Sequence, residues 1–286
     1  MLHTLLSVTK VMRIKEWRAY LALSLYGVVL SSNNLTYLLI RSLEIIVLLF
    51  PYMSSAYIAN NIFDVNGDSI NTNKRSRNPL STRELSLKTA LRVLYIMTGF
   101  EAFLGICLLF YSDLLASFLY LGGAILSLIY SIPPIRLKER PPLDILSHSI
   151  FFGISPFLVG FFLSIRSDIV STSWLATLSA LIAVYSAILE LRNEIEDYEF
   201  DKRVGYRTSA TKLGYGNSLR LLKVLFLSFA LLTIFFIIKF IKFYNYFILI
   251  PSIILLFIFI YKLKIRFMDI YAILFFLLTL LWRYLQ

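Results

Sequence analysis

The sequence has few charged residues, fewer acidic ones and almost no cysteine. Charged side chains make up 16% of the 286 residues, only 17 residues are Asp or Glu, and Cys107 is the single cysteine. One cysteine excludes a disulfide framework and a CxxC metal site. Soluble globular domains carry about 25% charged residues, so this composition excludes an ordinary soluble protein.

Long apolar runs fill most of the chain, and hydrophobic residues make up 58% of it. Because a membrane-crossing helix needs about 20 apolar residues, the runs predict an all-α polytopic membrane protein. We expect about nine transmembrane helices in a bundle around a central cavity. The expected spans are residues 19–32, 35–58, 91–111, 114–132, 143–165, 174–191, 221–240, 244–261 and 267–285.

Basic residues predict how the chain is oriented in the membrane. The formal net charge is +11, which in a soluble protein would indicate nucleic acid. Here, 22 of the 28 Lys and Arg residues fall on one side if the amino terminus lies inside. This asymmetry predicts an N-in, C-out protein of the cell membrane, with no nucleic-acid partner and no evident obligate protein partner.

Two acidic motifs stand out against this apolar background. One runs from Asn60 through Asp64 to Asp68, the other from Asn193 through Asp197 to Asp201, and both read N-[NE]-x-x-D-x-x-x-D. Each matching position is offset by 133 residues, and both motifs follow a span on the inner, cytoplasmic side. The chain is therefore expected to form one domain, residues 1–286, containing two pseudo-repeats at about 19–132 and 143–261 and a last helix.

The spacing of the motifs predicts a metal site. Residues four apart lie on one helix face, and carboxylates stacked at a helix carboxyl terminus repel one another and the helix dipole. Mg²⁺ prefers such oxygen ligands and completes its shell with water and phosphates. Either motif alone would also fit a solvated helix end, but the shared offset argues against that reading.

Basic side chains accompany both motifs. Lys74, Arg75 and Arg77 follow the first motif, and Lys202 and Arg207 follow the second. A third inner loop, 130–144, carries Lys138 among four prolines. Cations beside acidic metal ligands indicate an anionic ligand that bridges the two.

These features resemble the UbiA-type intramembrane prenyltransferases. The resemblance covers most of the chain, including residues 13–17, the Tyr130 to Lys138 loop and the segment from Gly205 to Gly214. The family usually has Asp where this chain has Asn61, so no metal role is assigned to that position.

The resemblance implies Mg²⁺-dependent transfer of a prenyl group from a polyprenyl diphosphate, such as geranylgeranyl diphosphate, to a lipophilic acceptor, with release of pyrophosphate. Asp64, Asp197 and Lys138 would be catalytic, and Asp64 is the candidate base. The metal ligands would be Asn60, Asp64, Asp68, Asn193, Asp197 and Asp201. The diphosphate contacts would be Lys15, Arg75, Lys138, Lys202 and Tyr130, with Arg13, Lys74, Arg77 and Arg207 as further candidates.

The acceptor is left open between several classes. A quinone-precursor aromatic acid is favoured, and a carotenoid or a glycerol-phosphate ether lipid is also compatible. A cation-coupled secondary transporter is the alternative function, since internal repeats and acidic residues near helix breaks also mark transporters. A membrane CDP-alcohol phosphotransferase is excluded because its D-x-x-D-G-x-x-A-R signature is absent.

Other polar residues within the spans carry smaller expectations. Arg41 and Glu44 are three residues apart and are expected to pair. His148 is expected to be a polar packing residue. Glu190, one turn before Asn193, is expected to support the second motif.

Overall fold

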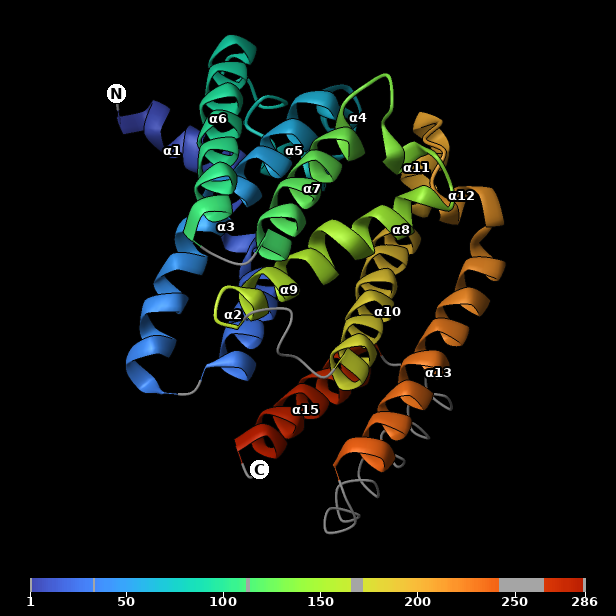
Figure 1. The fold of residues 1–286 in the computed structure, drawn as a ribbon. Coiled ribbons are helices and arrows are strands. Elements are labelled where there is room, and N and C mark those ends of the chain that lie inside the picture. The colour runs from blue at the N-terminus through green and yellow to red at the C-terminus, as the bar shows by residue number, and fades with distance from the viewer. Residues whose placement is uncertain (1, 33, 112–113, 166–171, 242–264, 285–286) are drawn as a thin grey trace.

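The computed structural model describes residues 2–32, 34–111, 114–165, 172–241 and 265–284, and these are helical with connecting turns (Figure 1). The predicted span at 244–261 lies outside the described residues. The long or apolar helices are α2 (Arg18–Ser31), α3 (Leu35–Phe63), α6 (Leu87–Tyr111), α7 (Leu114–Ser131), α10 (Thr172–Glu196), α13 (Tyr215–Phe240) and α15 (Ile265–Tyr284).

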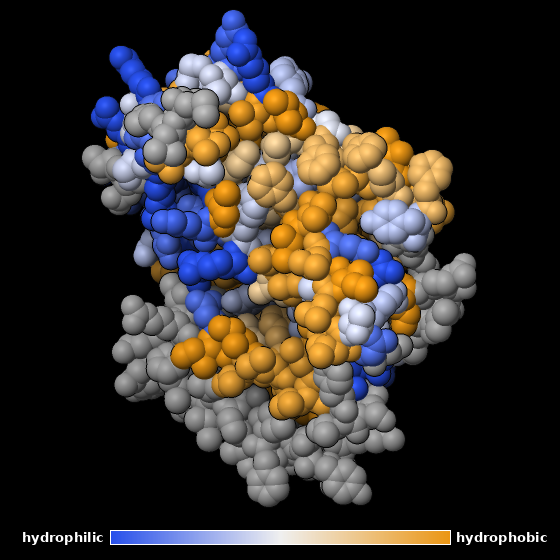
Figure 2. All heavy atoms as spheres, turned by 90° about the vertical axis from the view of Figure 1, so that its left-hand side faces the viewer, coloured by the Kyte–Doolittle hydropathy of each residue, from blue (hydrophilic) through white to orange (hydrophobic). Residues whose placement is uncertain are grey.

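Six helical segments of the described chain are long and apolar enough to cross a membrane: Leu35–Phe63, Leu87–Tyr111, Leu114–Ser131, Leu143–Phe162, Ser173–Glu196 and Tyr215–Phe240. They show an integral membrane protein. Large apolar side chains are exposed on these helices, among them Phe103 and Phe110 on α6 and Leu43 on α3. Figure 2 shows apolar side chains covering much of the face that lies on the left-hand side of Figure 1. The count of nine spans and the N-in, C-out orientation stay predictions.

The segment predicted as one span at 143–165 is built from three pieces. These are α8 (Leu143–His148), a π-helical turn η3 (Ser149–Ile154) and α9 (Ser155–Phe162). Hydropathy predicts the apolar run but not the π turn, because the residues of the turn are as apolar as those of the helices on either side. Such turns are rare in proteins, and those that occur often lie at functional sites.

Close helix packing holds this segment in the bundle. Helix α9 packs on α2, where a Cβ at Gly160 would lie 2.1 Å from the Ser24 carbonyl oxygen and one at Gly27 would lie 2.2 Å from that of Phe157. Small residues allow membrane helices this approach. Helix α10 packs on α13, and α3 packs on α6.

Short helices gather at one end of the bundle, uppermost in Figure 1. They are α4 (Val65–Ile70), α5 (Thr72–Arg77), α11 (Tyr198–Val204) and α12 (Ser209–Leu213). The remaining elements are α1 (Leu2–Val11) and the 3₁₀ turns η1 (Ile14–Glu16) and η2 (Leu137–Glu139). Both acidic motifs lie where a long helix meets a short one at this end.

Candidate active site

The two acidic motifs have the same local structure. Asn60 lies in the last turn of α3, and Asp64 sits at the junction with α4, with φ −102° and ψ 0°. Asn193 and Asp197 occupy the matching places between α10 and α11, and Asp197 has φ −90° and ψ −1°. Both junction residues thus lie near the sparsely populated bridge region, in which many active-site residues are found.

Backbone hydrogen bonds keep each motif in helical register through its junction. The amide of Asp64 donates to the Asn60 carbonyl at 3.0 Å, and that of Asp68 donates to Asp64 at 2.8 Å. In the second motif the matching distances are 3.0 and 2.9 Å. The helices are interrupted, contrary to the uninterrupted helix implied by the spacing, but the three polar residues still follow one face.

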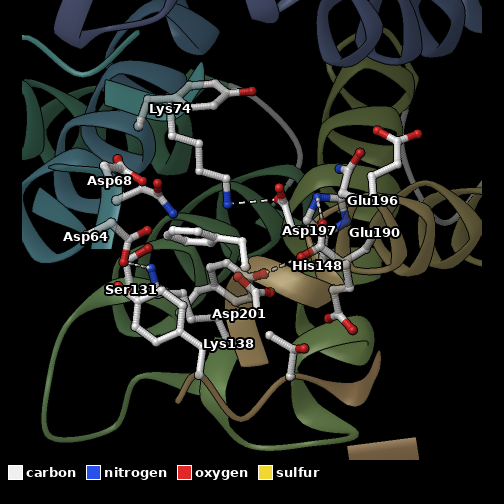
Figure 3. Close-up of a pocket in the computed structure, with 18 of the residues that line it drawn as sticks. Asp64, Asp68, Lys74, Ser131, Lys138, His148, Glu190, Glu196, Asp197 and Asp201 are labelled. Carbon is white, nitrogen blue, oxygen red and sulfur yellow. Dashed lines mark hydrogen bonds and ion pairs between the residues drawn. The ribbon is translucent and has the colours of Figure 1, made fainter. Parts of the chain in front are cut away.

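Both faces open into one cavity of about 930 Å³. Asp64 and Asp68 approach from one side and Asp197 from the other, with the Lys74 ammonium between them (Figure 3). All six predicted metal ligands line it: Asn60, Asp64, Asp68, Asn193, Asp197 and Asp201. The repeat thus brings two segments 133 residues apart to one site.

Lysine side chains pair with the acidic groups at the centre of this cavity. Nζ of Lys74 lies 2.8 Å from Oδ2 of Asp197, so the lysine that follows the first motif binds the second. Nζ of Lys138 pairs with Oδ1 of Asp64, which also accepts a hydrogen bond from Arg136 Nη2 at 3.1 Å.

Burial and charge shift the pKa values of these groups. Burial of the Asp201 carboxyl, aided by the nearby carboxylates of Asp197 and Asp64, raises its pKa to about 7. Burial likewise raises the pKa of Asp68 and lowers that of Lys138. For Lys74, burial is outweighed by Asp197 and its neighbours, which raise the pKa. Burial therefore disfavours the charged forms of Asp68 and Asp201, and a cation bound beside them would favour those charged forms.

Asn61 and Asn78 support the first motif from behind. The Asn61 side chain is fully buried, donates to the Val11 carbonyl at 2.8 Å and accepts from Nη2 of Arg13 at 2.6 Å. An aspartate at this position could not donate to the Val11 carbonyl. Asn78, which the motif analysis missed, donates to Oδ2 of Asp68 at 2.9 Å.

The predicted cationic residues divide into two groups. Arg13, Lys74, Arg77 and Lys138 line the cavity. The other four are exposed and are absent from its lining: Lys15, Arg75, Lys202 and Arg207. Arg136 was not singled out, although its place two residues before Lys138 in the same loop was a usable signal.

The deeper wall of the cavity is lined by aromatic rings and by a group of polar side chains separate from the acidic motifs. Phe151 and Phe152 from η3 line it, and Tyr20 stacks on Phe152 with ring centroids 4.2 Å apart. Tyr130, predicted at the diphosphate, donates its hydroxyl to Oε1 of Glu190 at 2.5 Å. His148 also lines the cavity.

The donor set fits magnesium held jointly with a substrate. Among the described residues, no three His, Cys, Asp or Glu side chains gather closely enough to form a metal site by themselves. Mg²⁺ usually takes one or two carboxylates and completes its octahedron with water and phosphate oxygens. The carboxylates and amides on the two sides of the cavity supply that kind of partial shell.

Comparison with known proteins defines the family. The model of the UbiA prenyltransferase family matches residues 20–281. The chain therefore belongs to this family.

Its curated relatives are distant. A protein named "Probable homogentisate phytyltransferase 2, chloroplastic" from Oryza sativa subsp. japonica is 29% identical over 166 residues, 55% of this chain and 41% of the relative. A "Lycopene elongase/hydratase" from Corynebacterium glutamicum is 30% identical over 191 residues, 66% of this chain and 64% of the relative. The chain thus matches less than two thirds of the length of either.

Solved structures show the same fold. A UbiA homolog from Archaeoglobus fulgidus bound to GPP and Mg²⁺ superposes with a TM-score of 0.72 at 16% identity, covering 97% of this chain and 98% of that one. The structure described for digeranylgeranylglyceryl phosphate synthase has a TM-score of 0.73 at 18% identity, covering 98% of both chains.

Proposed function

We propose that this protein transfers a prenyl group from an isoprenoid diphosphate to a lipophilic acceptor within the membrane and releases pyrophosphate. The observation that carries the proposal is the pair of acidic motifs facing each other across one cavity with Lys74 and Lys138 between them. A diphosphate has enough negative charge and oxygen acceptors to bridge bound cations and these ammonium groups. The family, and a homolog bound to GPP and Mg²⁺, support the same substrate class.

The six motif residues would hold Mg²⁺: Asn60, Asp64, Asp68, Asn193, Asp197 and Asp201. The metal would neutralise charge on the diphosphate and so make it a better leaving group. Lys138 and Lys74 would bind the departing oxygens, each leaving its carboxylate to do so. Arg13 and Arg77 line the same cavity and would contribute positive charge around the anion.

The residues that line the cavity suggest how the donor would lie and react. The prenyl chain would lie among the apolar helices below the motifs, with C1 beside the aromatic wall. The C1–O bond breaks with its electrons passing to the diphosphate. A nucleophilic atom of the acceptor, a carbon in an aromatic or carotenoid acceptor or a hydroxyl oxygen in a glycerol ether lipid, then bonds to C1, and the acceptor loses a proton. Aromatic faces such as those of Phe151 and Phe152 would stabilise positive charge on the chain.

The acceptor and the membrane topology complete the proposal. A quinone-precursor aromatic acid is the first acceptor to test, followed by a carotenoid and a glycerol-phosphate ether lipid. The matched positions of the two motifs support two helical repeats, and the distribution of basic residues along the sequence supports nine spans, an N-in, C-out orientation and a cytoplasmic site. A cation-coupled transporter would need its acidic groups at mid-membrane depth, whereas the motif carboxylates follow the ends of long helices.

Pyrophosphate release tests the proposed function. Purified protein in detergent would be given dimethylallyl, geranyl or geranylgeranyl diphosphate, with Mg²⁺ or EDTA, and a panel of acceptors. We expect Mg²⁺-dependent release that one acceptor accelerates. No release with any donor would refute the transferase, and cation-flux assays in liposomes would then test the transporter.

A further inference from the structure

Three side chains from three helices meet in the deeper wall of the cavity. Glu190 of α10 accepts a hydrogen bond from Tyr130 of α7 at 2.5 Å, and its other oxygen lies 3.3 Å from Nε2 of His148 of α8. Nδ1 of His148 is in turn 3.1 Å from Oγ of Ser186. The side chains of Glu190 and His148 are 13% and 4% exposed. A carboxylate held this deep in a membrane helix is costly and marks a functional group.

The depth of Glu190 places it below the diphosphate site. Glu190 precedes Asp197 by seven residues, which corresponds to about 10 Å along the helix axis. The wall around it consists of aromatic rings, including Phe152, whose centroid is 4.8 Å from that of His148. A diphosphate between the motifs would therefore direct C1 and the attacking acceptor carbon toward Glu190.

The proposed transfer needs a proton acceptor at this depth. When the acceptor carbon bonds to C1, its π electrons form the new C–C bond and leave a cationic adduct. The adduct must lose H⁺ so that the C–H electrons restore the double bond. Asp64 was the candidate base from sequence, but it is paired with both Lys138 and Arg136. In the described part of the chain, Glu190 has no Lys or Arg partner.

We propose, on the basis of the function proposed above, that Glu190 accepts this proton and that Tyr130 and His148 position its carboxylate. The hydroxyl of Tyr130 fixes one oxygen. The imidazole of His148 faces the other oxygen and shares the proton after transfer. The proton leaves to water when the product departs, which restores the carboxylate for the next turnover.

The test separates cleavage of the donor from deprotonation of the adduct. Glu190→Gln is compared with Glu196→Gln, a matched change on the same helix that also lines the cavity but whose side chain is 64% exposed. Pyrophosphate and prenylated product are both measured, with geranylgeranyl diphosphate as donor and 4-hydroxybenzoate or lycopene as acceptor. Perdeuterated acceptors give the isotope effect on product formation.

We expect Glu190→Gln to release pyrophosphate without acceptor within about threefold of the wild type. Product formation should fall at least about 100-fold, the usual contribution of a general base, and the deuterium isotope effect should rise because deprotonation becomes slow. Glu190→Asp should lie between the wild type and Glu190→Gln. Tyr130→Phe should slow product formation about tenfold with the same retained release. Glu196→Gln should match the wild type.

Two results would overturn this role for Glu190. One is product formation by Glu190→Gln within threefold of Glu196→Gln. The other is a parallel loss of pyrophosphate release and product with an unchanged isotope effect in Glu190→Asp, which would place Glu190 in donor binding or folding. A wild type that releases no pyrophosphate would refute the proposed function itself, a result readily distinguished from release without product in the variant.

Discussion

Replacing Lys138 with methionine removes one ammonium from the proposed diphosphate site and little else. The Lys138 side chain is 12% exposed and pairs with Asp64, which keeps Arg136 as a second partner at 3.1 Å. Methionine preserves much of the buried stem. Because Arg136 remains beside Asp64, the Asp64 carboxylate does not become an isolated buried charge, and the variant should fold.

The expected loss follows from the hydrogen bond that Lys138 would give to the leaving diphosphate. A hydrogen bond to a charged group contributes about 1.5–3 kcal/mol, which corresponds to a fall of about 10- to 150-fold in kcat/KM for the donor. Because negative charge grows on the diphosphate as the C1–O bond breaks, we expect kcat to fall as well as KM to rise.

Initial rates of pyrophosphate release at varied donor and saturating acceptor measure this effect. Lys88→Met is the matched control, since Lys88 is exposed in the first turn of α6 and does not line the cavity. The melting temperature in detergent reports folding. A donor kcat/KM within threefold of the control, or an increase confined to the acceptor KM, would refute the role given to Lys138.

Two further predictions concern the scaffold. Asn78→Ala removes the buried donor to Oδ2 of Asp68 and should lower the free energy of unfolding by about 2–4 kcal/mol; chemical denaturation in detergent measures this, and an unchanged midpoint would contradict it. Gly160→Ala should destabilise the fold by about 1–3 kcal/mol, because its Cβ would lie 2.1 Å from the Ser24 carbonyl oxygen. Gly122→Ala meets nothing within 4 Å and should unfold like the wild type, so equal melting temperatures for the two variants would argue against the α2–α9 contact.

Features set by neighbouring residues could be predicted from the sequence. The apolar runs located the described long helices to within a few residues at most ends, because hydropathy and length decide whether a helix can span a bilayer. The pairing of Arg41 with Glu44 is confirmed at 2.6 Å, since residues three apart meet on any helix. The three polar residues of each acidic motif were likewise expected on one helix face because they are four residues apart.

Features that depend on tertiary packing could not be predicted. The sequence places Lys74 beside the first motif, but its ammonium pairs with Asp197 of the second. Position near a motif likewise gave no means of separating the exposed Arg75 and Lys202 from the residues that line the cavity. The side chains around Glu190 come from three helices and a π turn, and no pattern of neighbouring residues in the sequence predicts that they lie together.

A double-mutant cycle on the two motifs tests the central claim most directly. Asp64→Asn, Asp197→Asn and the double variant would be compared with the wild type in Mg²⁺-dependent pyrophosphate release from geranylgeranyl diphosphate. If both carboxylates hold one metal–diphosphate complex, each single change should reduce kcat/KM at least about 100-fold and the double change little further, because residues acting as a unit are not additive. Activity of either single variant within threefold of the wild type, or multiplicative losses in the double variant, would contradict a shared site.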